Sequence, residues 1–71
     1  MKKYSESAAF MLEMHKIGIE VSLWDANSEI ICETMRDIVK KHSAEKAKKW
    51  YNDLQLLRAG IIKEKDMEDI N

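Results

Sequence analysis

The sequence contains no proline, only two glycines and one cysteine in 71 residues. Proline interrupts helices, so its absence favours helices joined by short turns. The single Cys32 excludes a disulfide within the chain, and no Cys/His cluster has the spacing of zinc ligands. No apolar run approaches the ~20 residues of a membrane span, and the first residues lack a signal-peptide core. We therefore expect a cytoplasmic protein with no membrane, metal or cofactor.

The charge is nearly balanced, with a formal value of −1 and 35% charged residues. A nucleic-acid-binding domain is usually clearly basic, so this balance counts against such a function. The length predicts a single domain over residues 1–71. A core of this size rarely supplies more than ~3–5 kcal/mol of net stability without a disulfide, a metal or a partner. Oligomerisation, most simply a dimer, is the expected support.

The clearest helical periodicity lies in residues 43–62. Ser43 is a suitable N-cap, and Gly60 is a suitable residue to end the helix in a left-handed conformation. Apolar residues recur at steps of three and four along this stretch and form one helical face. They are Ala47, Trp50, Leu54, Leu57 and Ile61.

Residues 19–25 are the most ambiguous, because their apolar residues alternate as in a short strand. No second strand signal exists for pairing, so we interpret them as a turn that leads into a helix. That helix begins either at Ser22, where Asp25 completes a pattern resembling a capping box, or at Asn27–Ser28. The longer version is favoured. It places Trp24, Asn27, Ile31, Met35 and Ile38 on one face, which Ile30 and Thr34 broaden.

The predicted fold is therefore all-α. It is a small bundle of three main helices, about 5–16, 22–41 and 43–59, followed by a short C-terminal helical turn over 63–69. The short link at His42–Ser43 predicts that helices two and three form an antiparallel hairpin, the alternative being one kinked rod. Two segments, LEMHKIGI and LQLLRAGI, echo one another, and we interpret the echo as common helix-capping chemistry rather than as a duplicated unit.

The second of these segments, with the residues after it, is similar to the short C-terminal helical hairpin of the SHOCT family. The similarity covers about the last third of the chain, and Lys63 and Met67 depart from the usual threonine and aromatic residue of that family. The resemblance implies a self-association or tethering module rather than an enzyme. The matching residues are Leu54, Leu57, Gly60, Ile61, Ile62, Glu64, Asp66 and Met67.

No residue pattern indicates catalysis. His15 has no partner required by spacing, and a surface or half-buried histidine is favoured. Glu29, Glu33 and Asp37 lack the Glu-x-x-His pattern of metal-binding bundles and are expected on a solvated face. Cys32 lies near mid-helix and is expected to be an inert packed thiol. Glycine-rich phosphate loops and hydrolase elbows are missing from the sequence. We expect no enzyme.

Charges of one sign gather in two places. Four acids against one base occupy residues 64–71, and six bases against two acids surround the predicted turn between helices two and three. Solvation of both ends is the simplest interpretation. The alternatives are pairing of the basic cluster with the acidic tail of a neighbouring copy, head-to-tail or antiparallel, or with nucleic acid. The bases are Arg36, Lys40, Lys41, Lys46, Lys48 and Lys49.

Two tryptophans are many for so short a chain, and we expect one to be enclosed and the other to lie under a partner chain or to be half-exposed. Trp50 and Tyr51 are expected nearer the assembly surface. The predicted interface residues are Trp24, Trp50, Tyr51, Leu54, Leu56, Leu57 and Ile61. The expected function is a non-enzymatic, self-associating protein–protein interaction module that acts as an adaptor, inhibitor or regulator, of the kind that phages and mobile elements encode. The alternative is a nucleic-acid-associated transcriptional regulator that uses the basic end, Arg36–Lys49.

Overall fold

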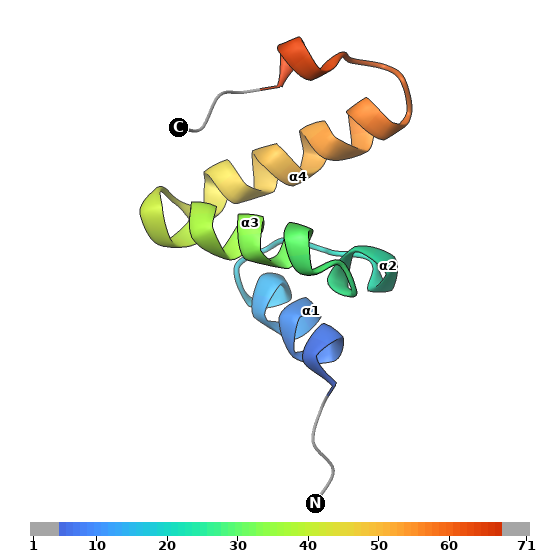
Figure 1. Ribbon diagram of the computed structural model, residues 1–71. Helices are drawn as coiled ribbons and strands as arrows, with labels where there is room; N and C mark the ends of the chain where they lie inside the picture. The colour runs from blue at the N-terminus through green and yellow to red at the C-terminus, as the bar shows by residue number, and fades with distance from the viewer. Residues whose placement is uncertain (1–4, 68–71) are drawn as a thin grey trace, which may run out of the picture. The chain divides into compact units, whose positions relative to one another are not determined.

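The computed structural model describes residues 5–67, and within them every regular element is a helix (Figure 1). The elements are α1 (Glu6–Lys16), α2 (Leu23–Ala26), α3 (Glu29–Lys41), α4 (Ala44–Arg58) and the short 3-10 helix η1 (Glu64–Asp66). The predicted all-α class is confirmed. The chain divides into two compact units, Met1–Thr34 and Met35–Asn71, and each is described by itself. The single domain over 1–71 stays a prediction.

All four α-helices begin after a serine whose hydroxyl caps a backbone amide. Ser5 Oγ accepts from Ala8 N at 3.1 Å and Ser22 Oγ from Asp25 N at 3.2 Å. Ser28 Oγ accepts from Ile31 N at 3.4 Å and Ser43 Oγ from Lys46 N at 3.1 Å. Each bond satisfies one of the amides that the first turn of a helix leaves without a partner. The predicted starts of the first and third helices are therefore confirmed.

Two helices, α1 and α4, end in the same hydrogen-bond pattern, which explains the sequence echo. At the end of α1, Gly18 N donates to His15 O and Ile19 N donates to Met14 O. At the end of α4, Gly60 N donates to Leu57 O and Ile61 N to Leu56 O. Both are Schellman motifs, which need a left-handed residue, and the two glycines have φ of 84° and 75°. Shared capping chemistry is confirmed as the basis of the echo.

The single helix predicted over 22–41 is wrong, because the chain breaks at Asn27–Ser28 and forms α2 and α3 instead. The side-chain nitrogen Nδ2 of Asn27 donates to Leu23 O at 3.0 Å, and Ser28 Oγ accepts from Ile31 N at 3.4 Å. Such local side-chain bonds compete with a continuous helical ladder. Both starting points that the sequence left open are used, one for each helix. Residues 19–25 do lead into a helix, but the turn lies at residues 17 and 18, and residues 19–22 have no regular secondary structure.

In the first unit, α1 and α2 pack against each other. Phe10 and Met14, one turn apart on α1, are almost completely buried. The other buried residues of this unit come from the segment after α1, from α2 and from the start of α3. They are Ile19, Val21, Asp25, Ala26, Ile31 and Cys32.

In the second unit, the buried residues lie on α3 and α4, which are joined by only His42 and Ser43. They are Met35, Ile38, Ala47 and Tyr51. After α4 the chain turns at Gly60 and enters η1, where Lys63 N donates to Asp66 Oδ2 at 3.0 Å (Figure 1). The helical turn predicted over 63–69 is shorter than expected, because Met67 is already extended. Residues 68 and 69 lie outside the described residues.

Burial on α3 makes a direct prediction for stability. Met35 is fully buried and Ile30 is mostly exposed. Met35→Ala should lower the free energy of unfolding by about 2–5 kcal/mol, because it removes packed atoms and leaves a cavity. Ile30→Ala on the same helix should change it by less than about 0.5 kcal/mol. Urea denaturation of both variants checks this, and equal losses would contradict the assignment of Met35 to the core.

Candidate interaction site

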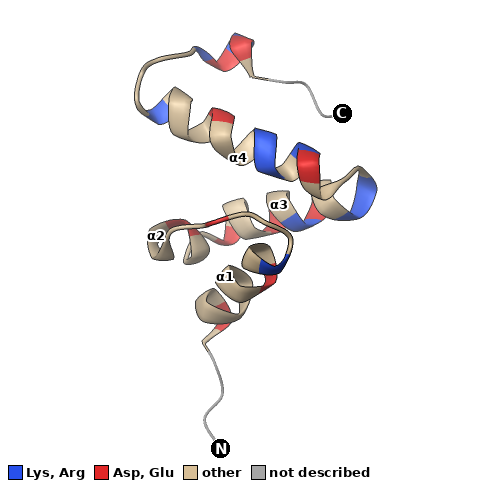
Figure 2. Cartoon of the chain, turned by 180° about the vertical axis from the view of Figure 1, so that it is seen from behind, with Lys and Arg blue, Asp and Glu red and all other residues tan. Residues whose placement is uncertain are grey.

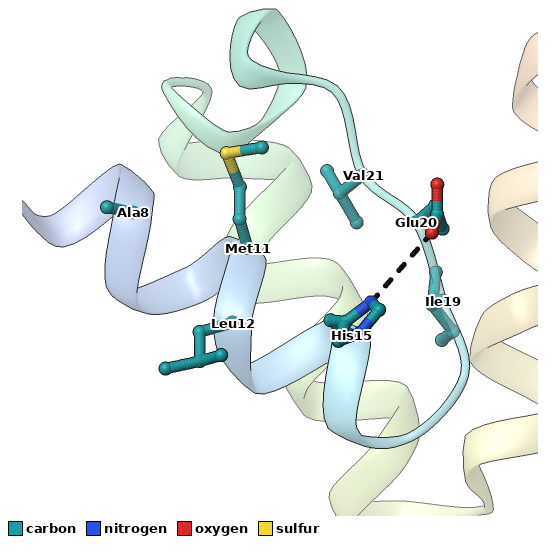
Figure 3. A pocket seen from close by; sticks show the side chains of 7 residues that line it. All are labelled: Ala8, Met11, Leu12, His15, Ile19, Glu20 and Val21. Carbon is teal, nitrogen blue, oxygen red and sulfur yellow. Dashed lines mark ion pairs between the residues drawn. The ribbon is translucent and has the colours of Figure 1, made fainter.

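An open groove of about 420 Å³ lies on the first unit, between α1 and the segment that follows it. Figure 3 shows Met11, Leu12 and His15 on α1 and Ile19, Glu20 and Val21 on the returning segment. The lining is mostly apolar, so the groove is better suited to binding an apolar side chain than to catalysing a reaction of a polar substrate. The lining residues are Ala8, Met11, Leu12, His15, Ile19, Glu20 and Val21.

The groove exists because the Schellman motif at Gly18 reverses the chain beside α1. Ile19 N donates to Met14 O at 2.9 Å, which fixes the first residue of the returning segment. Ile19 and Val21 are buried, whereas Glu20 between them is exposed. This alternation anchors the segment by two apolar residues and leaves its one carboxylate at the rim.

The rim carries one ion pair, between His15 Nδ1 and Glu20 Oε1 at 3.8 Å. Both side chains are mostly exposed, so the pair contributes little to stability when the histidine is charged. The prediction of a surface histidine is confirmed. His15 and Glu20 give the groove one polar edge, which can orient a ligand that has an apolar part and a polar part.

The cysteine and the line of carboxylates that the sequence raised as candidates for chemistry lie in the surroundings expected of non-catalytic residues. Cys32 is buried, and its thiol lies 3.3 Å from the carbonyl oxygen of Ala26, which agrees with a packed thiol. Glu29, Glu33 and Asp37 are exposed, as the predicted solvated face requires. Among residues 5–67, no three His, Cys, Asp or Glu side chains gather closely enough to hold a metal ion.

Three exposed apolar side chains, Leu23, Trp24 and Ile30, lie along residues 23–30, which we call the exposed apolar segment. Trp24 is 85% exposed and Ile30 is 77% exposed, and Leu23 is exposed as well. A continuous helix would have placed Trp24 on the buried face with Ile31 and Met35, two and three turns away. The break at Asn27–Ser28 removes Trp24 from that face, which sequence reasoning missed by favouring the longer helix.

The predicted interface residues on α4 are less accessible than expected. Tyr51 is only 7% exposed, so its ring belongs to the buried residues, and Trp50 is half-buried. The burial of Tyr51 contradicts the prediction that its ring lies near the surface. Of the two tryptophans, Trp24 is the more exposed to solvent. Leu54, Leu56 and Leu57 are half-buried.

Ile61 differs sharply from its counterpart in the echo. Ile19 and Ile61 occupy the same position of the two Schellman motifs, yet Ile19 is 2% exposed and Ile61 is 70% exposed. The apolar residue at this position commonly packs on its own helix. Ile61 is thus an exposed apolar residue of the second unit, and its place in an interface stays a prediction.

The six predicted cations, which we call the basic turn, are all exposed around the connection between α3 and α4 (Figure 2). They are Arg36, Lys40, Lys41, Lys46, Lys48 and Lys49. One ion pair joins Lys41 Nζ to Asp37 Oδ1 at 3.3 Å, the predicted i,i+4 contact. The structure therefore presents the bases to solvent, where a partner of negative charge can reach them.

Comparisons with protein-family models, with curated proteins and with solved structures found no match for this chain. No helix within residues 5–67 is long and apolar enough to cross a membrane. The case for a function therefore depends on the surfaces described above.

The left-handed conformation of Gly18, which turns the chain beside the groove, predicts how substitutions there change stability. Gly18→Ala should lower the free energy of unfolding by about 1–2 kcal/mol, because a φ of 84° is unfavourable for a residue with a Cβ atom. The new Cβ meets no atom within 4 Å, so the loss reports backbone strain rather than a clash. Gly18→Asn is the matched control and should lose less, because asparagine tolerates this conformation. Denaturant unfolding measures both, and an alanine variant as stable as the parent would contradict the strained turn.

Proposed function

We propose that this chain is a small, non-enzymatic protein–protein interaction module that self-associates and regulates or adapts a larger partner. The observation that carries the proposal is the exposed apolar segment, where Trp24 and Ile30 are 85% and 77% exposed within residues 23–30. Tryptophan is among the residues that most often dominate binding energy at interfaces.

The energetic case follows from the size of the tryptophan side chain. Aromatic side chains bury ~150–250 Å² each, so covering an exposed indole contributes roughly 4–6 kcal/mol before the costs of association. A core of 71 residues has little stability to spare. An association that covers Trp24 therefore adds apolar burial to a chain whose own core is small, although part of that gain offsets the cost of association.

The finer architecture belongs to the same proposal. We propose that α3 and α4 form an antiparallel hairpin, which the two-residue connection and the serine cap at Ser43 support. We also propose that the last third of the chain is related to the SHOCT-type helical hairpin. The helix end at Gly60, followed by the short helix η1, supports this relation. Such a module would act by tethering, and a cytoplasmic location stays a prediction.

Trp24→Ala tests the proposed function. Because Trp24 is exposed, the free energy of unfolding of the monomer should change by less than about 0.5 kcal/mol. The dissociation constant of the self-associated form should rise about thirtyfold or more, since a hot-spot residue contributes at least ~2 kcal/mol. Sedimentation velocity over a range of concentrations measures this.

The matched control is Ile17→Ala, which shortens an exposed apolar side chain outside residues 23–30. It should leave the dissociation constant nearly unchanged. A parent protein that stays monomeric at every concentration would contradict self-association, and equal effects of the two variants would contradict the role of Trp24.

A second candidate function is nucleic-acid association through the basic turn, favoured by the exposure of all six cations. The test is DNA and RNA binding at several salt concentrations. Lys48→Glu with Lys49→Glu should weaken binding and reduce the slope of log K against log salt by about 2, because two phosphate contacts are lost. Lys63→Glu with Lys65→Glu, which reverses two lysines outside the basic turn, is the control. Equal binding by both pairs would reject this candidate.

A further inference from the structure

The two units carry opposite charge. Residues 1–34 contain six acids and three bases, a formal charge of −3, and residues 35–71 contain nine bases and seven acids, a formal charge of +2. Five of the six acids in the first set are exposed, the exception being the buried Asp25. The near-neutral total charge of the chain therefore conceals an acidic half and a basic half.

Three acids lie within or close to the exposed apolar segment along the chain. Glu20 precedes it, Glu29 is next to Ile30, and Glu33 lies one turn further along α3 from Ile30. Residues three apart on a helix are neighbours on its surface. All three carboxylates are exposed and lie in the segment or within three residues of it along the chain, so the apolar side chains have an acidic margin in the sequence. A surface of this composition fits a partner that offers cations together with aliphatic area.

We propose that the exposed apolar segment of one copy docks on the basic turn of a second copy, an inference that rests on the proposed self-association. The lysine and arginine side chains of the basic turn supply both requirements, because their long stems are apolar and their ends are cationic. Trp24 contributes the aromatic face on which such cations bind. The carboxylates of Glu20 and Glu33 pair with ammonium groups at the edge of the contact.

Charge complementarity is what selects a second copy as the occupant. Each chain carries one acidic apolar segment and one basic turn, so two chains satisfy both surfaces when each donates to the other. Such a reciprocal contact is isologous and closes at two subunits. Two copies of the acidic surface, by contrast, would repel each other, and so would two copies of the basic turn.

A charge exchange between full-length chains tests the proposal. One variant carries Glu20→Lys and Glu33→Lys, and the other carries Lys48→Glu and Lys49→Glu. Each alone should self-associate at least about tenfold more weakly than the parent, because like charges face each other across the contact. An equimolar mixture should recover the affinity of the parent as a heterodimer, since both contacts are again between opposite charges. The control pair, Lys63→Glu and Lys65→Glu, should associate like the parent.

The outcomes separate this inference from the proposed function. Recovery in the mixture, with parental association that weakens as salt screens the charges, supports the reciprocal contact. Association that is lost in Trp24→Ala but is indifferent to both charge reversals overturns the inference and leaves the proposed function intact. A parent that is monomeric at every concentration overturns both. A monomeric parent whose basic turn binds DNA or RNA also overturns both, and favours the nucleic-acid function.

Discussion

The structure depends on the hydrogen bonds that satisfy the backbone N–H and C=O groups at the ends of its helices. With no proline in the chain, the boundaries are set by small polar residues and glycine. Ser5, Ser22, Ser28 and Ser43 each cap a helix start, and Gly18 and Gly60 each close a Schellman motif. These local bonds determine where the chain turns, and the turns determine which apolar residues reach the core.

The interruption at Asn27–Ser28 shows how one boundary creates a surface. The side chain of Asn27 bonds back to Leu23, and a new helix starts one residue after Ser28. Ile31 and Met35 keep their buried face, whereas Trp24 and Ile30 are left in solvent. The same short stretch is bordered by exposed carboxylates, while the bases gather around the turn from α3 to α4. An apolar, acidic surface and a basic surface thus arise from the same set of helix boundaries.

Sequence reasoning predicted what local chemistry determines. The limits of α1 and α4 and the two glycine caps follow from serine, glycine and apolar spacing, and they agree with the structure. The break in the second helix was missed because Asn27 and Ser28 are tolerated inside helices, and their effect depends on the bonds they make. The exposure of Trp24 and the burial of Tyr51 were missed for a related reason, since both depend on tertiary packing that periodicity does not specify. The groove beside α1 was also missed, although Gly18 followed by alternating Ile19 and Val21 was a usable signal.

The central claim is that association covers the exposed apolar segment, and quenching of Trp24 fluorescence tests it most directly. In a Trp50→Phe background, Trp24 is the only tryptophan, so its quenching by acrylamide reports the accessibility of that one side chain. The account predicts strong quenching in dilute protein and progressive protection as the concentration rises, with a midpoint that matches the dissociation constant from sedimentation. Quenching that stays equally strong while the protein associates would contradict the account, because the interface would then lie elsewhere on the chain.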